Sequence, residues 1–247
     1  MELEALVNRP TNITKVVIDG DIIAYRCSIS AQEYPFGECA NRIDDMMDYC
    51  INQTVGFDLG TNHLTFLTGK DNFRNEVSKT YHYKGNRKDT EKPQHLEPAR
   101  GYLVDKWGAE VINGREADDA IAETAYGTPN SVIVSVDKDF LTVPGWMYNF
   151  VKDTWTYSTE EMALEFFYTQ ILTGDTADNI VGLYRIGPKK AGQILDGWTT
   201  ERELFDKTLE AYKSSETLIG DPYERLLENA RLLHLCRYEG EVWKPPE

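Results

Sequence analysis

Short apolar runs that end beside an aspartate are the feature that most constrains the fold of this 247-residue chain. Val16–Ile18 directly precedes Asp19, and Ser131–Val136 directly precedes Asp137. A third run, Asn62–Thr68, alternates between apolar and polar residues as a strand does. Runs of this length and composition indicate β-strands, because buried helices are usually longer.

Stretches with helical periodicity separate these runs. Apolar residues recur at helical spacing in Glu38–Val55, and Glu116–Tyr126 suits a helix that begins at acidic residues. Alternating strands and helices predict an α/β fold of three layers with a mostly parallel central sheet. From Thr159 onward the pattern is helical, in residues 159–172, 188–195, 200–214 and 222–237. We therefore expect an α/β core in residues 1–158 and a helical part in residues 159–247.

The total charge and its distribution along the chain point to different binding partners. The formal net charge of −15 argues against nucleic acid, because non-specific binding places Lys and Arg on phosphates. The distribution of charge matters more than its total, however. Basic residues gather in Lys79–Arg100, and Lys189 and Lys190 form a second basic pair. Carboxylates at a metal site count as negative charge in this total until the ions bind.

The cysteines and the apolar runs bear on the compartment. The four cysteines show no CxxC spacing, which indicates reduced thiols and argues against a zinc site. No run approaches the roughly 20 apolar residues of a membrane span, and the start of the chain lacks a signal-peptide pattern. We expect a cytoplasmic protein with no membrane partner.

Acidic residues stand where a parallel sheet would gather them. Asp19, Asp71 and Asp137 each follow a predicted strand, and open α/β sheets bind ligands beyond the carboxyl ends of their strands. Further acids accompany them, namely Glu116, Asp118, Asp119, Asp139, Asp175 and Asp178. Like charges about 4 Å apart repel by roughly 4 kcal/mol at an effective dielectric of 20. Mg²⁺ or Mn²⁺, which prefer oxygen ligands, would remove this repulsion, and two such ions can promote phosphodiester hydrolysis.

Each acid also has an ordinary structural interpretation. A lone Asp after a strand is often a turn residue or a helix cap, and acids are favourable at a helix N-terminus. Glu116 and Asp118 are two residues apart and cannot share the face of a regular helix. Asp175 and Asp178 either share a helix face or form a turn. The joint pattern, rather than any single acid, indicates a metal site.

Five sequence blocks, in this order, resemble the 5′ nucleases. That family includes bacteriophage 5′–3′ exonucleases, flap endonucleases and the 5′-nuclease domain of bacterial DNA polymerase I. The blocks are Asp19-Gly, Tyr83-Lys-Gly-Asn-Arg87, Gly114-Arg-Glu-Ala-Asp-Asp119, Ser135-Val-Asp-Lys-Asp139 and Gly174-Asp-Thr-Ala-Asp-Asn-Ile180. The resemblance implies a PIN-like 5′-nuclease core followed by a helix–three-turn–helix element. It also implies a metal-dependent 5′–3′ exonuclease or flap endonuclease that hydrolyses DNA, or RNA in RNA–DNA hybrids.

Carried over by position, the resemblance implies two groups of metal ligands and a set of basic DNA contacts. The first ion would be held by Asp19, Asp71, Glu116 and Asp118, and the second by Asp137, Asp139, Asp175 and Asp178, with Asp119 in support. The ions would be Mg²⁺, for which Mn²⁺ can substitute, and the catalytic acids Asp19, Asp118 and Asp137. Lys84 and Arg87 match residues that contact the scissile phosphate, within an arch near residues 83–100. Arg74 and Lys88 are further candidates, and a solvated basic surface is the alternative.

The segment Ile186-Gly187-Pro188-Lys189-Lys190 is similar to the hairpin turn of the family's helix–three-turn–helix element. A glycine turn that leads into a helix directs backbone N–H groups and the helix dipole at a phosphate, and it reads no bases. The family usually has Gly-Ile-Gly, whereas Arg185 stands at the first position here. Arg185 either adds a phosphate contact or marks a different turn, which leaves open the K⁺ site that relatives often have there.

The expected partner is DNA with a free 5′ end, a flap or a duplex–single-strand junction, cut by a stand-alone, phage-like, monomeric enzyme in the host cytoplasm. Three alternatives are open. A haloacid-dehalogenase-type phosphatase would use Val16–Ile22, Thr68 and Gly174-Asp175. A PIN-type ribonuclease shares the acidic core. A non-catalytic module would hold duplex DNA through the hairpin turn without divalent metal.

Overall fold

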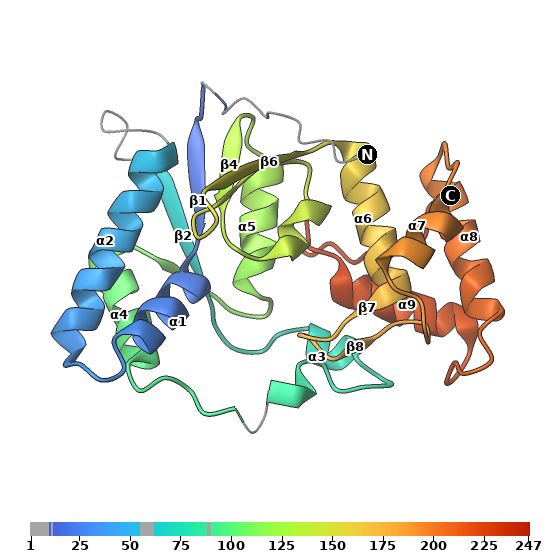
Figure 1. The fold of residues 1–247 in the computed structure, drawn as a ribbon, viewed down its shortest axis with the longest axis horizontal. Coiled ribbons are helices and arrows are strands. Elements are labelled where there is room, and N and C mark those ends of the chain that lie inside the picture. Colours follow the sequence, from blue (N-terminus) through green and yellow to red (C-terminus); the bar gives the residue numbers. More distant parts are fainter. Residues whose placement is uncertain (1–9, 11, 55–61, 88–89) are drawn as a thin grey trace.

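The computed structural model describes residues 10, 12–54, 62–87 and 90–247. In these residues one sheet contains β1 (Lys15–Asp19), β2 (His63–Thr68), β3 (Glu110–Ile112), β4 (Ser131–Val134), β5 (Gly145–Asn149) and β6 (Thr154–Ser158). The strand order is β3-β2-β1-β4-β5-β6, and every neighbouring pair is parallel except the antiparallel hairpin β5–β6 (Figure 1). The mostly parallel sheet expected from the sequence is confirmed.

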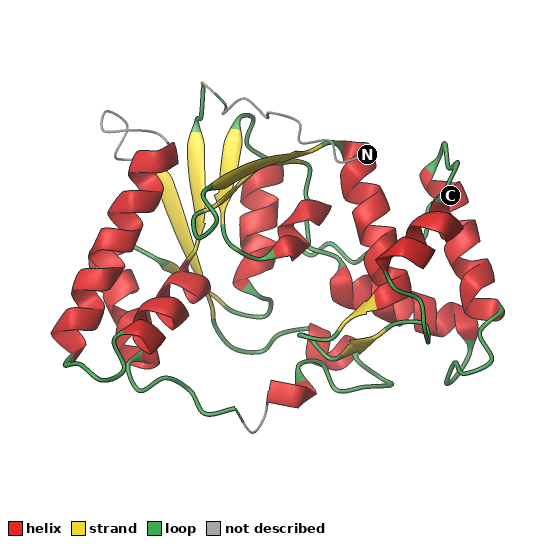
Figure 2. Ribbon diagram, in the orientation of Figure 1, coloured by secondary structure: helices red, strands yellow, loops and turns green. Residues whose placement is uncertain are grey.

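Helices cover both faces of this sheet because side chains alternate along each strand. Val16 and Ile18 of β1 pack with α1 (Gly20–Ser30), α2 (Phe36–Thr54) and α4 (Leu96–Trp107). Val17 faces the other way, toward α5 (Ala117–Tyr126). Figure 2 shows these helices on either side of the strands. The helix α1 was not expected from the sequence, because its apolar residues form no single stripe.

The chain after β6 is mainly helical, as expected. It contains α6 (Glu160–Thr173), α7 (Pro188–Leu195), α8 (Glu201–Lys213) and α9 (Pro222–Leu233). Thr159, Thr200 and Asp221 cap three of these helices by accepting backbone N–H groups with their side-chain oxygens. The helices enclose a second apolar core that includes Tyr168 and Tyr212.

Small elements connect the sheet to these helices. They are α3 (Arg74–Val77), the 3-10 helices η1 (Gly85–Arg87) and η2 (Lys138–Thr142), and the strands β7 (Gly174–Asp175) and β8 (Ile180–Val181). The β7–β8 hairpin is tight, since a Cβ on Gly174 would lie 2.3 Å from the Gly182 nitrogen. Asp175 and Asp178 therefore lie in a hairpin rather than on one helix face, which decides between the two interpretations of their spacing.

Length and hydropathy of the helices also bear on membrane insertion. No helix in the described part of the chain combines the length and the apolar character needed to cross a bilayer.

Candidate active site

Asp19 lies at the carboxyl end of β1, where it also caps α1. Only 2% of its surface is exposed. Its Oδ1 accepts the Ile22 N–H at 3.1 Å, and its Oδ2 accepts the hydroxyl of Ser135, just beyond β4, at 2.7 Å. Burial, together with the charges of Asp21 and Asp137, raises the pKa of Asp19 to about 7. No cation of the protein pairs with this carboxyl group in the described residues.

Asp118 lies in the first turn of α5 and faces the same place. Burial raises the pKa of Asp118 well above its ordinary value, and the charges of Asp19, Glu116 and Asp137 add to the shift, against Lys84. These mutual effects show that carboxylates from β1, α5 and the segment after β4 converge. In the part of the chain that is described, no hydrogen bond or ion pair engages the Asp118 carboxylate. Asp118 therefore lies among other carboxylates, and its own carboxylate oxygen atoms are available to bind a cation.

A second acidic group surrounds η2. Asp137 caps this short helix by accepting the Asp139 N–H at 2.9 Å. Burial and the charge of Asp137 raise the pKa of Asp139 to about 6. The Nε2 of Gln170 donates to Asp139 at 2.6 Å, and the Lys138 ammonium lies 2.7 Å from Asp175 Oδ2. Burial raises the pKa of Asp175, but the Lys138 hydrogen bond and charge outweigh it and lower the pKa.

The segment from Tyr83 to Arg87 joins these groups across the β7–β8 hairpin. Tyr83 Oη lies 2.8 Å from Glu116 Oε2 and 2.8 Å from Asp178 Oδ2, although the phenol carries one hydrogen to donate. The Lys84 ammonium contacts Glu116 and lies 3.6 Å from Asp178. Arg87 pairs with Asp178 at 2.6 Å. Lys84 therefore lies among the carboxylates, whereas Arg87 pairs with Asp178 from a side chain that stays 52% exposed.

The donor set fits oxygen-preferring divalent ions in its chemistry. Its members are carboxylates, and within the described residues neither Asp19 nor Asp118 forms an ion pair with a cation of the protein. Within the described residues, however, no three acidic, histidine or cysteine side chains are spaced to complete a ligand set around one ion. Lys84 and Lys138 hold Glu116, Asp178 and Asp175 in ion pairs instead. Opening these ion pairs would free Glu116, Asp178 and Asp175 to act as ligands.

Asp119 and Arg74 occupy a different position from the one expected. Arg74 is 1% exposed and Asp119 is fully buried, and the two form a bidentate pair at 2.6 and 2.8 Å. A guanidinium enclosed in this way does not reach a DNA phosphate. Both Asp119 oxygens are already engaged. The burial of Arg74 argues against the phosphate contact expected there, and the pair suits the supporting position expected of Asp119 rather than direct metal ligation.

Of two further expected residues, the structure describes only Asp71. Asp71 is exposed in the loop after β2, with a positive φ of 63° that Asp tolerates better than most residues. Its segment lies against Gly114, whose N–H donates to the Lys70 carbonyl at 2.7 Å. Its metal role stays a prediction. Lys88 lies outside the described residues.

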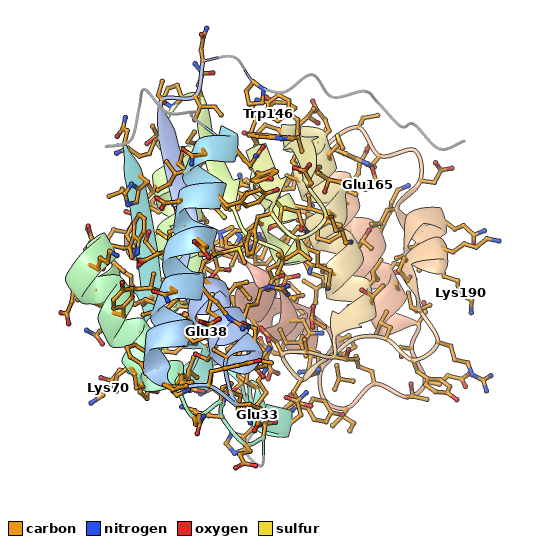
Figure 3. All side chains as sticks on the ribbon, turned by 60° about the vertical axis from the view of Figure 1, so that its left-hand side comes forward. Glu33, Glu38, Lys70, Trp146, Glu165 and Lys190 are labelled. Carbon is orange, nitrogen blue, oxygen red and sulfur yellow. The ribbon has the colours of Figure 1, made fainter. Side chains whose placement is uncertain are left out.

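The segment in which the hairpin turn is expected carries an exposed basic surface. Gly187 caps α7, and Lys189 and Lys190 are exposed in its first turn; Lys190 projects outward in Figure 3. Arg185 has a positive φ of 59° and lies over the Tyr184 ring, 5.0 Å from its centroid. The four side chains Tyr184, Arg185, Lys189 and Lys190 are therefore accessible to a large ligand.

Sequence reasoning missed some partners of the carboxylates. Tyr83 and Ser135 lie inside quoted blocks, yet only the three-dimensional contacts assign them hydrogen bonds to Glu116 and Asp19. Nothing in the sequence marks Gln170 as a partner of Asp139, because it occupies an ordinary position in a helical pattern. Its buried Oε1 has no partner within the described structure.

The contacts of Thr68 and Asp21 argue against the phosphatase alternative. The Thr68 hydroxyl accepts the Ala117 N–H at 2.9 Å, and Asp21 pairs with Arg100 and accepts the Thr68 N–H. Both side chains therefore form structural contacts between β2, α1, α4 and α5, which leaves them engaged and not free for phosphatase chemistry.

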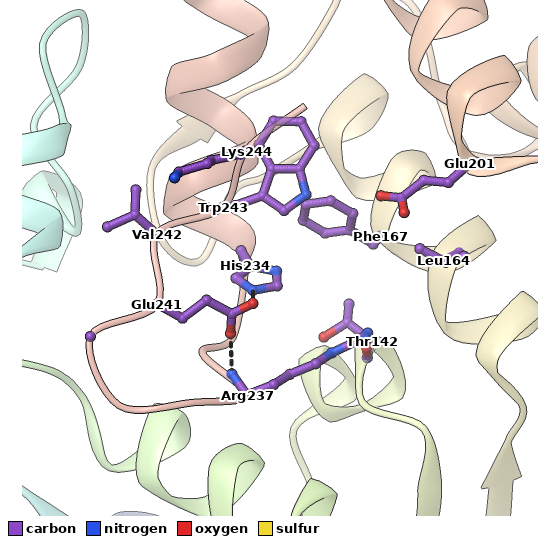
Figure 4. A pocket seen from close by; sticks show the side chains of 11 residues that line it. Thr142, Leu164, Phe167, Glu201, His234, Arg237, Glu241, Val242, Trp243 and Lys244 are labelled. Carbon is purple, nitrogen blue, oxygen red and sulfur yellow. Dashed lines mark hydrogen bonds and ion pairs between the residues drawn. The ribbon is translucent and has the colours of Figure 1, made fainter. Parts of the chain in front are cut away.

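A pocket at the C-terminal segment contains none of the expected site residues. It is lined by Phe167 of α6 and by residues beyond α9, among them His234, Arg237, Glu241 and Trp243 (Figure 4). His234 Nε2 lies 3.2 Å from Glu241 Oε1. A dashed line marks this contact in Figure 4. This pocket is distinct from the carboxylate cluster.

Comparison with known sequences gives two similar proteins. A 5′-3′ exonuclease of Mycoplasma pneumoniae is 28% identical over 236 residues, which cover 83% of this chain and 79% of the relative. A DNA polymerase I of Rhizobium leguminosarum is 31% identical over 163 residues, which cover 56% of this chain but only 16% of the polymerase. No family model matches the chain.

Solved structures match the fold over most of the chain. The zinc-bound 5′-exonuclease of bacteriophage T5 has a TM-score of 0.60 at 18% identity, over 89% of this chain and 88% of that protein. The T5 flap endonuclease with DNA and metal ions gives 0.58 at 21% identity, over 88% and 85%. The catalytic core of Rad2 with a DNA substrate gives 0.59 at 14% identity, over 95% and 84%. The fold is that of the 5′ nucleases, and the resemblance of the sequence to that family is confirmed.

Proposed function

We propose that this protein is a divalent-metal-dependent 5′ nuclease that cuts DNA from a free 5′ end as an exonuclease and flap endonuclease. The observation that carries the proposal is the convergence of Asp19, Asp118 and Asp137, whose charges act on one another, beside the Lys84 ammonium. The similarity to a 5′-3′ exonuclease and to DNA-bound flap endonucleases supports the same activity.

The carboxylates would hold two ions in the groups implied by the resemblance. Asp118 lies near both Asp19 and Glu116, and Asp137, Asp139 and Asp175 lie around η2. Asp178 contacts Tyr83, Lys84 and Arg87 beside Glu116, so its part in the second group stays a proposal. Bound Mg²⁺, or Mn²⁺ in its place, supplies Lewis acidity and a water of lowered pKa at this site. Ser135 would orient Asp19, and Gln170 would orient Asp139, through their hydrogen bonds to these carboxylates. The Tyr83 hydroxyl oxygen lies 2.8 Å from both Glu116 and Asp178 and would hold the two carboxylates close to each other.

Lys84 and Arg87 would stabilise charge on the scissile phosphate. Burial lowers the pKa of Lys84, but Glu116 and Asp178 outweigh it and raise the pKa, so the ammonium stays charged. A phosphate that enters the cluster competes with these carboxylates for Lys84 and Arg87. The same exchange frees Glu116 and Asp178 to face cations, which couples DNA binding to assembly of the site.

The duplex behind the cut would lie on the helical part, residues 159–247. Gly187, Lys189, Lys190 and Arg185 would contact its phosphates through the expected helix–three-turn–helix element, with K⁺ at the turn, and the binding would not depend on sequence. Residues 83–100, with Lys88, would form the arch over the single strand. A monomer suffices for these contacts, since one chain carries both surfaces.

Cleavage of 5′-labelled substrates tests this function. Flap, blunt duplex and single-stranded DNA should be incubated with Mg²⁺, Mn²⁺ or EDTA, beside an RNA–DNA hybrid and a chromogenic phosphomonoester. We expect metal-dependent cutting near the junction of the flap, and none in EDTA. Turnover of the phosphomonoester alone, or duplex binding without any cutting, contradicts the proposal.

A further inference from the structure

Arg74 makes an unusually complete set of buried hydrogen bonds. Besides its bidentate pair with Asp119, its Nε donates to the Leu232 carbonyl at 2.9 Å and its NH2 nitrogen to the His234 carbonyl at 2.7 Å. Burial lowers the pKa of Arg74, but the hydrogen bond and charge of Asp119 outweigh it and raise the pKa. The guanidinium is therefore a fixed cation that joins separate parts of the chain.

The carbonyl groups that accept from Arg74 belong to the end of α9. The last carbonyls of a helix have no partners within it and carry the negative end of the helix dipole. Leu232 lies in the last turn of α9, and His234 follows that helix as its cap. A buried cation at this point compensates both the unpaired carbonyls and the dipole. Arg74 thus anchors the segment after α9 to α3.

Asp119 connects the same junction to the first turn of α5. It accepts the Cys236 N–H at 3.1 Å and the Glu116 N–H at 3.2 Å, in addition to both contacts from Arg74. Its neighbour Asp118 faces the carboxylate cluster, so one helical turn carries an anchored acid and an unpaired acid side by side. The position of Glu116 and Asp118 depends on how firmly Asp119 is held.

A purely stabilising role does not account well for this pair. Replacing a buried ion pair by apolar residues of similar volume is often neutral or favourable for stability. A bidentate pair with four further hydrogen bonds to backbone groups instead fixes the direction and register of the segments it joins. Such precision matters where ligands must converge, because outer partners of metal ligands change metal affinity by about 10–100-fold.

We propose that Arg74 and Asp119 are positioning residues that hold Glu116 and Asp118 in place for metal binding. The residues that take part in the junction come from α3, the start of α5 and the segment Leu232–Cys236. This inference rests on the proposed metal site. In this inference the segment Leu232–Cys236 affects metal binding indirectly, through its hydrogen bonds to Arg74 and Asp119.

Metal binding without DNA provides the test. Mn²⁺ affinity should be measured by titration calorimetry for Arg74→Met, Arg74→Lys and Asp119→Asn, together with thermal stability in EDTA. The matched control is Asp44→Asn, which removes a carboxylate that joins α2 to Lys106, Tyr102 and Trp107 of α4, away from the cluster. We expect the Met and Asn variants to bind Mn²⁺ about 10–100-fold more weakly, with partial recovery in Arg74→Lys.

The control separates positioning from loss of stability. Asp44→Asn should lower the melting temperature and leave the Mn²⁺ affinity within twofold of the parent, a margin set by the usual scatter of such titrations. Folded Arg74 and Asp119 variants with the parent's affinity overturn the inference, as does an equal loss of affinity in the control. If the parent protein binds Mn²⁺ but cuts no DNA, the proposed function is refuted. The comparison of Mn²⁺ affinities between the parent and its variants still tests the positioning role. Should Arg74→Met not fold, Arg74→Lys and Asp119→Asn decide the question.

Discussion

The Lys138 ammonium lies 2.7 Å from Asp175 Oδ2, which places a largely exposed cation of the protein beside the acidic group around η2. The same nitrogen lies 3.5 Å from Asp139 Oδ1. Lys138 therefore reduces the repulsion between two carboxylates that come from η2 and β7.

Lys138→Met should lower stability when no divalent ion is present. Without the ammonium, Asp139 and Asp175 repel each other, and a loss of about 1 kcal/mol corresponds to roughly 2–4 °C in melting temperature for a chain of this size. Mn²⁺ should stabilise the variant more than the parent. Thermal unfolding in EDTA and in Mn²⁺ measures both effects, with the exposed Lys152→Met as control. Equal metal-induced shifts in parent and variant would show that Lys138 does not substitute for a metal cation.

Asp118→Asn should lower the rate of DNA cleavage and raise the stability of the metal-free protein. The change removes a negative charge that lies among Asp19, Glu116 and Asp137, so the variant should be more stable than the parent in EDTA by about 1 kcal/mol. Cleavage should fall by at least about 100-fold, since a ligand of the ion matters at least as much as its outer partners. Unfolding curves and single-turnover rates check the two results. A variant that cuts at the parent's rate removes Asp118 from the site.

Glu228 should make the stability of the helical part sensitive to acid. It accepts N–H groups from Lys79 and Thr80 at 2.6 and 2.7 Å, and it pairs with Arg225 at 2.6 Å. Burial raises the pKa of Glu228, but these bonds outweigh it and lower the pKa below the ordinary 4.5. Its contribution is therefore complete above about pH 4.5 and is lost as the pH falls through the lowered value.

Glu228→Gln should accordingly lose about 2 kcal/mol at pH 7 and show a flatter decline of stability below pH 4.5. Denaturant unfolding between pH 7 and pH 3 measures this difference. Glu224→Gln, an exposed substitution on the same helix, is the control and should follow the parent. If both variants decline in parallel with the parent, the bonds of Glu228 do not favour its charged form.

Lys189→Ala combined with Lys190→Ala should weaken duplex binding and its salt dependence. Each phosphate contact contributes about 0.9 to the slope of log affinity against log salt, so losing two should flatten the slope by roughly 2. Fluorescence anisotropy with a labelled duplex in EDTA measures the slope. The exposed pair Lys152→Ala and Lys213→Ala provides a charge-matched control. A slope equal to the parent's excludes phosphate contacts at α7.

The sequence was sufficient to predict the strands β1, β2 and β4, the covering helices α2 and α5, and the helical part that follows the sheet. Apolar runs such as Val16–Ile18 are short and bounded, so they identify strands, and their aspartates fall at the carboxyl edge because the strands are parallel. The convergence of Asp19, Asp118 and Asp137 follows from this topology. The hairpin geometry of Asp175 and Asp178 did not follow, because a spacing of three is compatible with both a helix and a turn.

The partners of charged residues were beyond sequence reasoning. Arg74 and Asp119 are 45 residues apart, and nothing in either local pattern distinguishes a buried ion pair from an exposed ligand. The contacts of Lys84 and Arg87 with Asp178 likewise depend on the loop that brings residues 83–87 against the β7–β8 hairpin. Long-range pairing of this kind depends on tertiary packing, which local periodicity does not encode.

Anomalous diffraction from crystals grown with Mn²⁺ tests most directly whether the carboxylates form a metal centre. We expect a Mn²⁺ peak coordinated by Asp118 together with Asp19 or Glu116, and a second peak beside Asp137 and Asp139 when DNA is present. An absence of bound Mn²⁺ at millimolar concentration, or peaks only at surface acids such as Glu33, would contradict the proposal that these carboxylates are a catalytic metal site.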